Sequence, residues 1–307
     1  MITKEDMYFH TPTSEDPYWA ETNYFGFYVP GEPLHVNVYV LTRKNLGVVL
    51  SSVTVTDGFS NGSHLVRYSN HQVHLPFPKT NLDNYELGNG LAIKCTKPVM
   101  DYTIKFDDQG RVAFNVEYKA LMAPYDIHDP AMDPLAAAAD NVSKTAYAGH
   151  WDQTGRVVGE LVLDGQRYDI DCVSSMDHSW GQRKEDQFKN FCWLNANFDN
   201  DVSIHCIWAI NPEDINDYCA IAHGYVREGD KVYGLVKGSG KLRRNGLLHQ
   251  HMDLQVEDVR GTRHHFTGTA FTSNPWQPWP FVNATQSLLR WDLGGVVGWG
   301  EVQDVCM

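Results

Sequence analysis

Alternating apolar and polar residues predict a long series of β-strands. Residues 34–41 alternate between an aliphatic face and a polar or aromatic face, which is typical of a half-buried strand. The first face consists of Leu34, Val36, Val38 and Val40, and the second of His35, Asn37 and Tyr39. Further strands are expected at residues 48–56, 91–96, 102–106, 111–121, 157–163, 166–172, 191–198, 202–210, 218–226, 231–237, 249–257, 264–271, 287–291 and 296–305.

Turn residues divide these strands at intervals of roughly ten residues, as in a sandwich or barrel. Residues 107–110 turn the chain into one hairpin, and the pair Asp164-Gly165 gives the strongest hairpin signal. The second arm of that hairpin runs directly into Asp177. No helical periodicity is sustained, so the pattern predicts an all-β protein. We expect two β-rich units, residues 1–183 and 184–307.

Three stretches interrupt this pattern. Residues 59–84 and 276–280 read as loops. Residues 122–147 hold three prolines and a run of alanines, and Asp133-Pro134 at its centre can begin a short helix. A long loop inside a compact domain is often functional or acts as a lid.

Composition narrows the class of partner. The net charge of −13 over 307 residues offers no basic surplus for nucleic acid or for an anionic membrane. The first residues contain no apolar signal segment, and no window approaches the about 20 apolar residues of a membrane span. Six scattered cysteines without a C-x-x-C pair indicate reduced thiols. We therefore expect a cytoplasmic protein. The sequence is compatible with a homodimer.

Motifs of the common cofactor-dependent enzymes are missing from the sequence. There is no Walker loop, no G-x-S-x-G elbow, no H-E-x-x-H helix and no glycine-rich turn opening a helix. His249 and His251 can share one strand face as metal ligands, but no carboxylate or third histidine lies at a diagnostic spacing. We therefore expect neither a metal nor a cofactor.

Candidate chemistry concentrates in residues 175–183. Alternation along a strand directs Asp177 and Ser179 to one face, and His178 and Trp180 to the other. Ser179 and His178 cannot then form a nucleophilic pair without a turn. An acid sheltered by an indole has a raised pKa and can protonate a substrate, whereas pairing with Arg183 would keep Asp177 ionised. A structural corner, with Trp180 in the core, is the alternative interpretation.

Aromatic and histidine side chains elsewhere can form the wall of an apolar cavity around this acid. Each can equally be an ordinary core residue, because aromatic side chains are common in β-sheet packing. The candidates for substrate binding are Trp180, Trp151, Trp193, Trp208, Tyr24, His35, Tyr39, His205 and Arg183.

The run Asp177-His178-Ser179-Trp180-Gly181 resembles the Asp-His-[Asn/Ser]-Trp-Gly signature of the hydroxyneurosporene synthase superfamily. That superfamily includes carotenoid 1,2-hydratases and fungal kievitone hydratases, and the lipocalin-like pericyclases look related in architecture. Two further stretches, residues 155–165 and residues 23–58, are similar to this family.

The resemblance implies two lipocalin-like β-barrel or β-sandwich domains, with an apolar pocket between or within them, and chemistry without a cofactor. Asp177 would be the general acid of a hydratase or lyase. His178 would orient it or relay protons, and Trp180, Trp151 and Trp193 would line the site. The implied substrate is a hydrophobic small molecule with a C=C bond, of terpenoid, prenylated or polycyclic type. A cyclase or isomerase of the pericyclase type, or a non-catalytic binder, remains an alternative.

Overall fold

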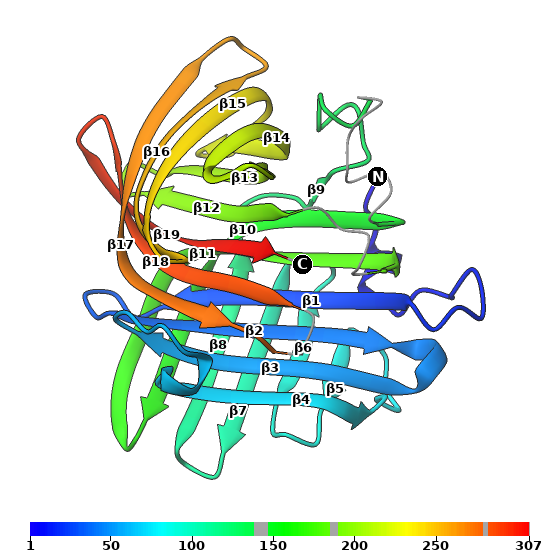
Figure 1. The fold of residues 1–307 in the computed structure, drawn as a ribbon. Helices are drawn as coiled ribbons and strands as arrows, with labels where there is room; N and C mark the ends of the chain where they lie inside the picture. The colour runs from blue at the N-terminus through cyan, green and yellow to red at the C-terminus, as the bar shows by residue number, and fades with distance from the viewer. Residues whose placement is uncertain (138–146, 185–189, 279–281, 307) are drawn as a thin grey trace.

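Within the described residues, strands form every long element, and three short 3-10 helices lie among them (Figure 1). The computed structural model describes residues 1–137, 147–184, 190–278 and 282–306. The first set of strands is β1 (Trp19–Tyr28), β2 (Leu34–Arg43), β3 (Val48–Asp57), β4 (Tyr68–Pro76), β5 (Asn84–Glu86), β6 (Ala92–Lys97), β7 (Asp101–Asp108), β8 (Val112–Ala120), β9 (Tyr125–Asp126), β10 (Gly149–Leu163) and β11 (Gln166–Gln182). The second set is β12 (Phe191–Phe198), β13 (Val202–Asn211), β14 (Asp214–Glu228), β15 (Lys231–Asn245), β16 (Leu248–Asp258), β17 (Arg263–Trp276), β18 (Asn283–Leu293) and β19 (Val296–Cys306). The 3-10 helices are η1 (Lys4–Met7), η2 (Lys44–Leu46) and η3 (Ser63–Leu65).

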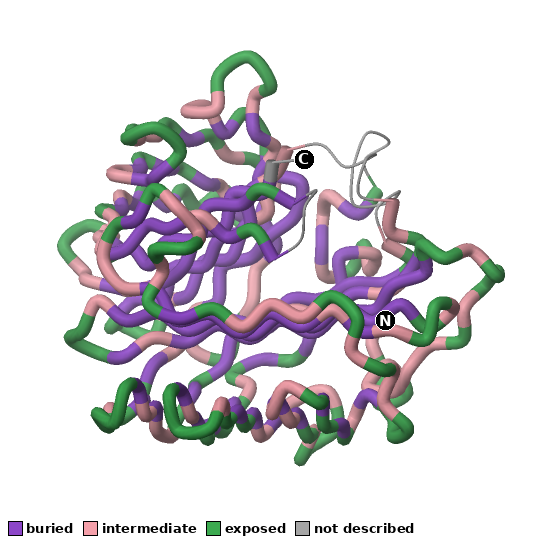
Figure 2. The backbone as a smooth tube through the Cα atoms, turned by 60° about the horizontal axis from the view of Figure 1, so that its bottom comes forward, coloured by how far each residue is buried: buried purple, intermediate pink, exposed green. Residues whose placement is uncertain are grey.

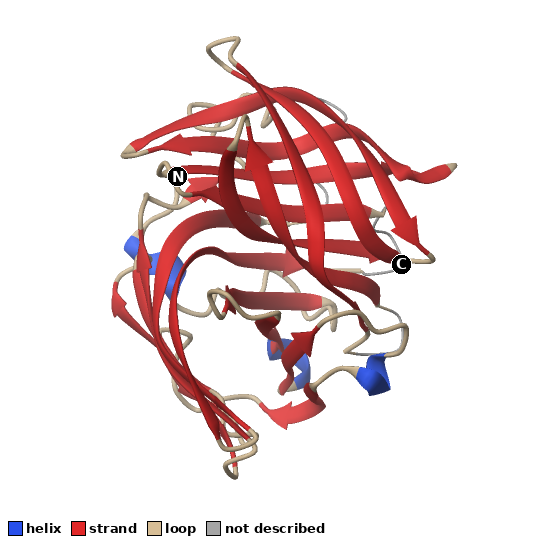
Figure 3. Ribbon diagram, turned by 90° about the vertical axis from the view of Figure 1, so that its left-hand side faces the viewer, coloured by secondary structure: helices blue, strands red, loops and turns tan. Residues whose placement is uncertain are grey.

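The first set of strands forms one antiparallel sheet in the order β4-β3-β2-β1-β11-β10-β8-β7-β6-β5, with β9 paired to β10. Its centre is the hairpin of β10 and β11, whose turn residues Asp164 and Gly165 both have positive φ, at 50° and 82°. This geometry is that of a two-residue hairpin turn, so the hairpin prediction is confirmed. Figure 3 shows how strongly the sheet curls.

The second set, β12 to β19, closes into an eight-stranded barrel with each strand paired to its sequence neighbours. The predicted all-β class is therefore confirmed: a curled sheet joins a closed barrel. The last strand of the sheet ends at Gln182, and the first strand of the barrel begins at Phe191.

Strand β2 corrects one expectation. We predicted a half-buried strand at residues 34–41, yet every residue of β2 is buried. Val36 and Val38 face the core of the curled sheet, whereas Tyr39 and Leu41 pack with the barrel residues Trp193 and Trp276. The barrel therefore covers the face that a free sheet would expose to water.

Three further segments differ from the structure that the sequence pattern predicted. Residues 59–84, expected as a loop, contain strand β4, which pairs with β3 and makes Tyr68 part of the core. Trp276, also assigned to a loop, is the last residue of β17. The short helix expected from Asp133-Pro134 is absent from the described part, where residues 134–137 form a turn; the remainder of that prediction lies outside the described residues.

Buried residues gather along the middle of the molecule, where the sheet meets the barrel (Figure 2). One core fills the curled sheet and another fills the barrel. A third cluster, which includes Tyr24, Tyr39, Trp193 and Trp276, belongs to both units. Within the described residues, no helix is both long and apolar enough to cross a membrane.

Substitution of Gly26 tests the packing of the sheet on the barrel. A Cβ atom at Gly26 would lie 2.4 Å from Oε2 of Glu301, which is buried and hydrogen-bonded to Tyr24 and His35. Because a shift of Glu301 would disturb these hydrogen bonds, Gly26→Ala should lower the free energy of unfolding by about 1–3 kcal/mol. Thermal denaturation measures this loss.

Gly88→Ala is the matched control, because its nearest heavy atom, in Leu75, would be 3.9 Å away. We expect a change within about 0.5 kcal/mol for that variant. Equal stability of the two variants would show that the sheet and barrel are not packed as described.

Candidate active site

Strand β11 directs alternate residues of the signature to opposite faces of the sheet. Asp177 and Ser179 line a cavity on the barrel side. His178 lies on the other side, where its Nδ1 is 2.5 Å from the backbone oxygen of Thr22, to which it donates. Trp180 shares that side and stacks on His10, with ring centroids 3.9 Å apart. The signature thus contributes to the cavity with one face and to the core with the other.

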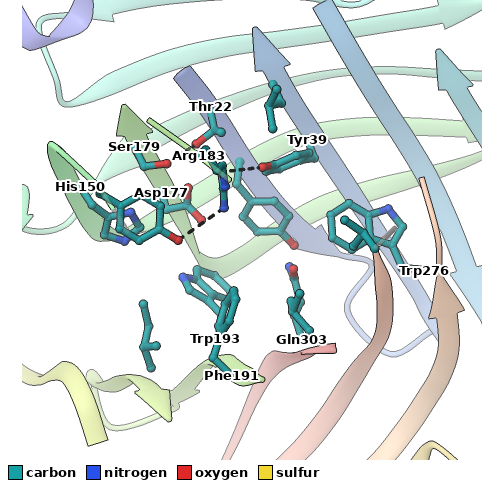
Figure 4. Close-up of a pocket in the computed structure, with 16 residues that line it drawn as sticks. Thr22, Tyr39, His150, Asp177, Ser179, Arg183, Phe191, Trp193, Trp276 and Gln303 are labelled. Atoms are coloured by element: carbon teal, nitrogen blue, oxygen red, sulfur yellow. Dashed lines mark hydrogen bonds between the residues drawn. The ribbon is translucent and has the colours of Figure 1, made fainter. Parts of the chain in front are cut away.

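The cavity lies between the sheet strands β1, β2, β10 and β11 and the barrel strands β12, β13, β17 and β19 (Figure 4). Its volume is about 70 Å³. Aromatic and aliphatic side chains make up most of its wall, and polar groups gather near Asp177. The lining residues are Thr22, Tyr24, Tyr39, Leu41, Tyr147, His150, Asp177, Ser179, Arg183, Phe191, Trp193, Ile207, Trp276, Val282, Gln303 and Val305.

Asp177 is half-buried in this wall. Burial raises the pKa of its carboxyl group to about 7; Asp152 and Glu301 add to this rise, while His150 and Arg183 oppose it. Among the described residues, no ion pair within 4.0 Å joins Asp177 to Arg183. The closed salt bridge that would keep Asp177 ionised is therefore not formed, and the acid can be protonated near neutral pH.

Arg183 lies at the same wall, where two tyrosines hold it. Its guanidinium donates to the hydroxyl of Tyr39 at 3.0 Å and to that of Tyr147 at 3.4 Å. The guanidinium carbon also lies 5.3 Å from the centroid of the Tyr147 ring, within cation–π range. These contacts place a cationic hydrogen-bond donor beside the apolar wall (Figure 4).

A buried carboxylate, Asp152, stands directly behind the cavity wall. Its Oδ2 lies 2.9 Å from Nε2 of His150, 2.5 Å from Nε2 of His223 and 3.2 Å from Nε2 of His205. Its Oδ1 accepts from the indole N–H of Trp193 at 2.8 Å. The sheet supplies Asp152 and His150, whereas the barrel supplies the other three, so the cluster ties the two units together.

The charge of this cluster follows from its contacts. Burial alone would raise the pKa of Asp152, but His205 and His150 hold it well below the usual range. Burial lowers the pKa of His223, yet hydrogen bonds to Asp133 and Asp152 outweigh it and raise that pKa to about 9. His223 is therefore an imidazolium between two carboxylates near neutral pH.

Two groups of three potential ligands in the described residues lie close enough to surround a metal ion. They are His10, Glu21 and His178, and His150, Asp152 and His223. In each group, hydrogen bonds and ion pairs already join the imidazoles to the carboxylate. These contacts explain both groups as hydrogen-bonded links between side chains, and we assign no metal to either group.

His249 and His251, which were considered as metal ligands but not predicted to be a metal site, are placed in different surroundings. His249 is buried, with Nδ1 bonded to Ser287 and Nε2 beside Asp304. His251 instead lies beside Thr269. A register shift in β16 separates the two imidazoles, because His251 pairs with Arg243 and His249 with Arg244.

The structure brings five predicted site residues to one cavity: Asp177, Tyr24, Tyr39, Trp193 and Arg183. The other six lie elsewhere, because strand alternation or the barrel directs them into packed interiors. His178, Trp180 and Trp151 face the core of the curled sheet, and Trp208 fills the barrel. His35 binds Glu301, and His205 joins the Asp152 cluster.

Sequence reasoning missed His150, Tyr147, Trp276 and Gln303. Tyr147 is the last residue of the segment predicted as a long loop, and His150 lies just beyond it, outside every predicted strand. The alternation of His150 with Asp152, two residues apart, is a signal that could have marked one strand face as polar. Trp276 and Gln303 lie on barrel strands and reach the cavity because the barrel closes and packs on the sheet. A local sequence pattern does not predict that packing.

Solved structures of other proteins share this fold. An AttH-like protein from Nitrosomonas europaea matches with a TM-score of 0.62 and 9% identity, over 96% of this chain and 94% of that one. CghA matches with a TM-score of 0.60 and 12% identity, over 94% and 88%. Kievitone hydratase from Nectria haematococca matches with a TM-score of 0.52 and 12% identity, over 96% and 90%. These likenesses confirm the lipocalin-like fold expected from the signature.

The chain belongs to the family described as Domain of unknown function (DUF7064), whose model matches residues 3–304. No curated protein matches the chain.

Asp152→Asn tests the tie between sheet and barrel. Neutralising Asp152 leaves the buried imidazolium of His223 with one carboxylate partner in place of two. Because removing one member of a buried charge pair is strongly destabilising, we expect a loss of about 3 kcal/mol. Chemical denaturation measures it.

Glu160→Gln, on the same strand, is the control, since Glu160 pairs with Arg167 at the surface. Its loss should stay below about 1 kcal/mol. A loss at Asp152 no larger than that of the control would contradict the described tie.

Proposed function

We propose that the protein is an enzyme of the hydratase–lyase class. It acts on a C=C bond of an apolar terpenoid, prenylated or polycyclic substrate, with Asp177 as the general acid. One observation carries this proposal: a carboxyl group whose pKa is raised to about 7 faces a cavity walled by Tyr24, Trp193 and Trp276. The fold shared with a protein named kievitone hydratase supports the reaction class.

The chemistry follows from the groups around the cavity. Protonated Asp177 donates its proton to one carbon of the double bond, which leaves a carbocation on the other. The faces of aromatic rings attract such a cation, and Trp193, Tyr24 and Trp276 present rings to the cavity. Water then captures the cation. These steps use only side chains of this chain and water.

Cavity size limits which part of the substrate reaches Asp177. A volume of about 70 Å³ holds a small reacting group, whereas pockets for whole drug-sized ligands measure roughly 300–1,000 Å³. The reacting end of the substrate therefore enters the cavity, and the remainder occupies its mouth. His178 receives no role in this reaction because it faces the opposite side of β11.

A cyclase or isomerase of the pericyclase type is the second candidate. Arg183, held by Tyr39 and Tyr147 at the apolar wall, favours it as a hydrogen-bond donor that stabilises charge on a folded substrate. Labelled water separates the two reactions, because only hydration transfers solvent oxygen to the product. A non-catalytic binder would retain ligand and give no product.

Asp177→Asn tests the general acid directly. The variant keeps the shape of the side chain but carries no acidic proton, so product formation should fall at least about 100-fold. The assay incubates a panel of prenylated phenols and terpenoid alkenes in ¹⁸O-labelled water, and mass spectrometry detects the hydrated product. Asp171→Asn is the control: Asp171 lies on the same strand but is exposed and paired with Arg156. Near wild-type turnover by Asp177→Asn would exclude the assignment.

The rate should also depend on pH in a defined direction. Only the protonated form of Asp177 donates, and the fraction of that form falls as the pH rises through about 7. Above that pH, kcat/KM should therefore decline about tenfold per unit. Stopped assays between pH 6 and about 9 measure the profile. A rate that rises over this range would indicate that the carboxylate acts as a base instead.

A further inference from the structure

Only one of the two ring nitrogens of His150 has a hydrogen-bond partner among the described residues. Its Nε2 lies 2.9 Å from Oδ2 of Asp152, whereas its Nδ1 is buried and has no hydrogen-bond partner among the described residues. The imidazole lines the cavity, and the Tyr147 ring stacks on it with centroids 4.9 Å apart. Buried polar atoms normally have a hydrogen-bond partner, so Nδ1 of His150 is available to a ligand in the cavity.

The contact with Asp152 decides which nitrogen carries the proton. Asp152 is ionised, so its oxygen accepts and Nε2 of His150 must donate. With the proton on Nε2, the lone pair of the His150 ring lies on Nδ1, which can accept a proton. A carboxylate that orients an imidazole and stabilises its protonated form is the arrangement of a catalytic acid–base pair.

His150 and Asp177, which both line the cavity, belong to the neighbouring strands β10 and β11. In the β10–β11 ladder, His150 pairs with Ser179 and Asp152 pairs with Asp177. His150 and Asp177 are thus two residues apart along the ladder and on the same side of the sheet (Figure 4). Hydration of a double bond needs both a proton donor and a proton acceptor, and this cavity holds one of each.

We propose that His150 is the general base of the cavity, with Nδ1 accepting a proton from the water that captures the carbocation. This inference rests on the proposed function and adds to it the second catalytic residue. The substrate class narrows accordingly, to alkenes whose cation is trapped by external water.

The proton count closes over one cycle. The O–H bond of Asp177 breaks and a C–H bond forms, which leaves the carbocation. A lone pair of water forms the C–O bond, an O–H bond of that water breaks, and its proton passes to Nδ1. The cavity then holds a carboxylate and an imidazolium. Return of the proton from His150 to Asp177 restores both groups for the next cycle.

Deuterium exchange separates the two roles. In D₂O, reversible protonation by Asp177 introduces deuterium into the alkene, and this step does not require a base for water. His150→Gln should therefore lose hydration at least about 100-fold in kcat while exchange continues. Asp177→Asn should lose both. The probe is the prenylated phenol that the wild-type enzyme hydrates.

Each outcome decides the matter. Normal hydration by His150→Gln beside an inactive Asp177→Asn overturns the base and leaves the proposed function standing. Loss of both exchange and hydration in His150→Gln makes His150 a positioning residue and also overturns the base. Absence of wild-type hydration across the panel overturns the proposed function together with this inference.

Chemical rescue supplies a second variant. His150→Ala removes the ring and leaves space for free imidazole, so added imidazole should restore hydration in proportion to its concentration. His265→Gln is the matched control, because His265 makes the same contact with Asp253, at 2.7 Å, on the surface. That control should hydrate at the wild-type rate. Failure of imidazole to restore a folded His150→Ala variant would count against the base.

Discussion

Coverage of both faces of β11 over residues 172–181 is the constraint on which the rest of the structure depends. One face completes the core of the curled sheet with Met176 and His178, and the other meets the barrel with Asp177 and Ser179. A strand with a solvated face would leave Asp177 in water at its ordinary pKa. Because the barrel covers that face, the side chains of the strand must be either packed or hydrogen-bonded.

Two acids on neighbouring strands show how strongly local surroundings set protonation. Asp152 and Asp177 are partners in the β10–β11 ladder, yet the pKa of Asp152 is well below the usual range and that of Asp177 is raised to about 7. Three imidazoles and an indole N–H surround the first carboxylate. The second carboxyl group faces a cavity whose wall is mostly aromatic and aliphatic. Pairs of acids driven apart in this way are typical of acid–base sites.

Local pattern predicted the elements well and their partners poorly. The Asp164-Gly165 hairpin, most strands and the two faces of the signature follow from turn chemistry and a period of two. Packing of the sheet against the barrel buries the second face of β2. It also places Trp276 and Gln303 in the same cavity wall as Asp177. Those contacts join residues at least 99 positions apart, and no single-strand pattern contains that information.

The histidine of the signature illustrates the same limit at the site itself. His178 is adjacent to Asp177 in sequence, and the family resemblance implied that it orients the acid or relays protons. Adjacent residues in a strand face opposite ways, so His178 instead binds the Thr22 backbone beneath the sheet. The imidazole that shares the cavity with Asp177 comes from the next strand, at His150. In a β-protein, an acid's chemical partner is therefore better sought across the ladder than along the chain.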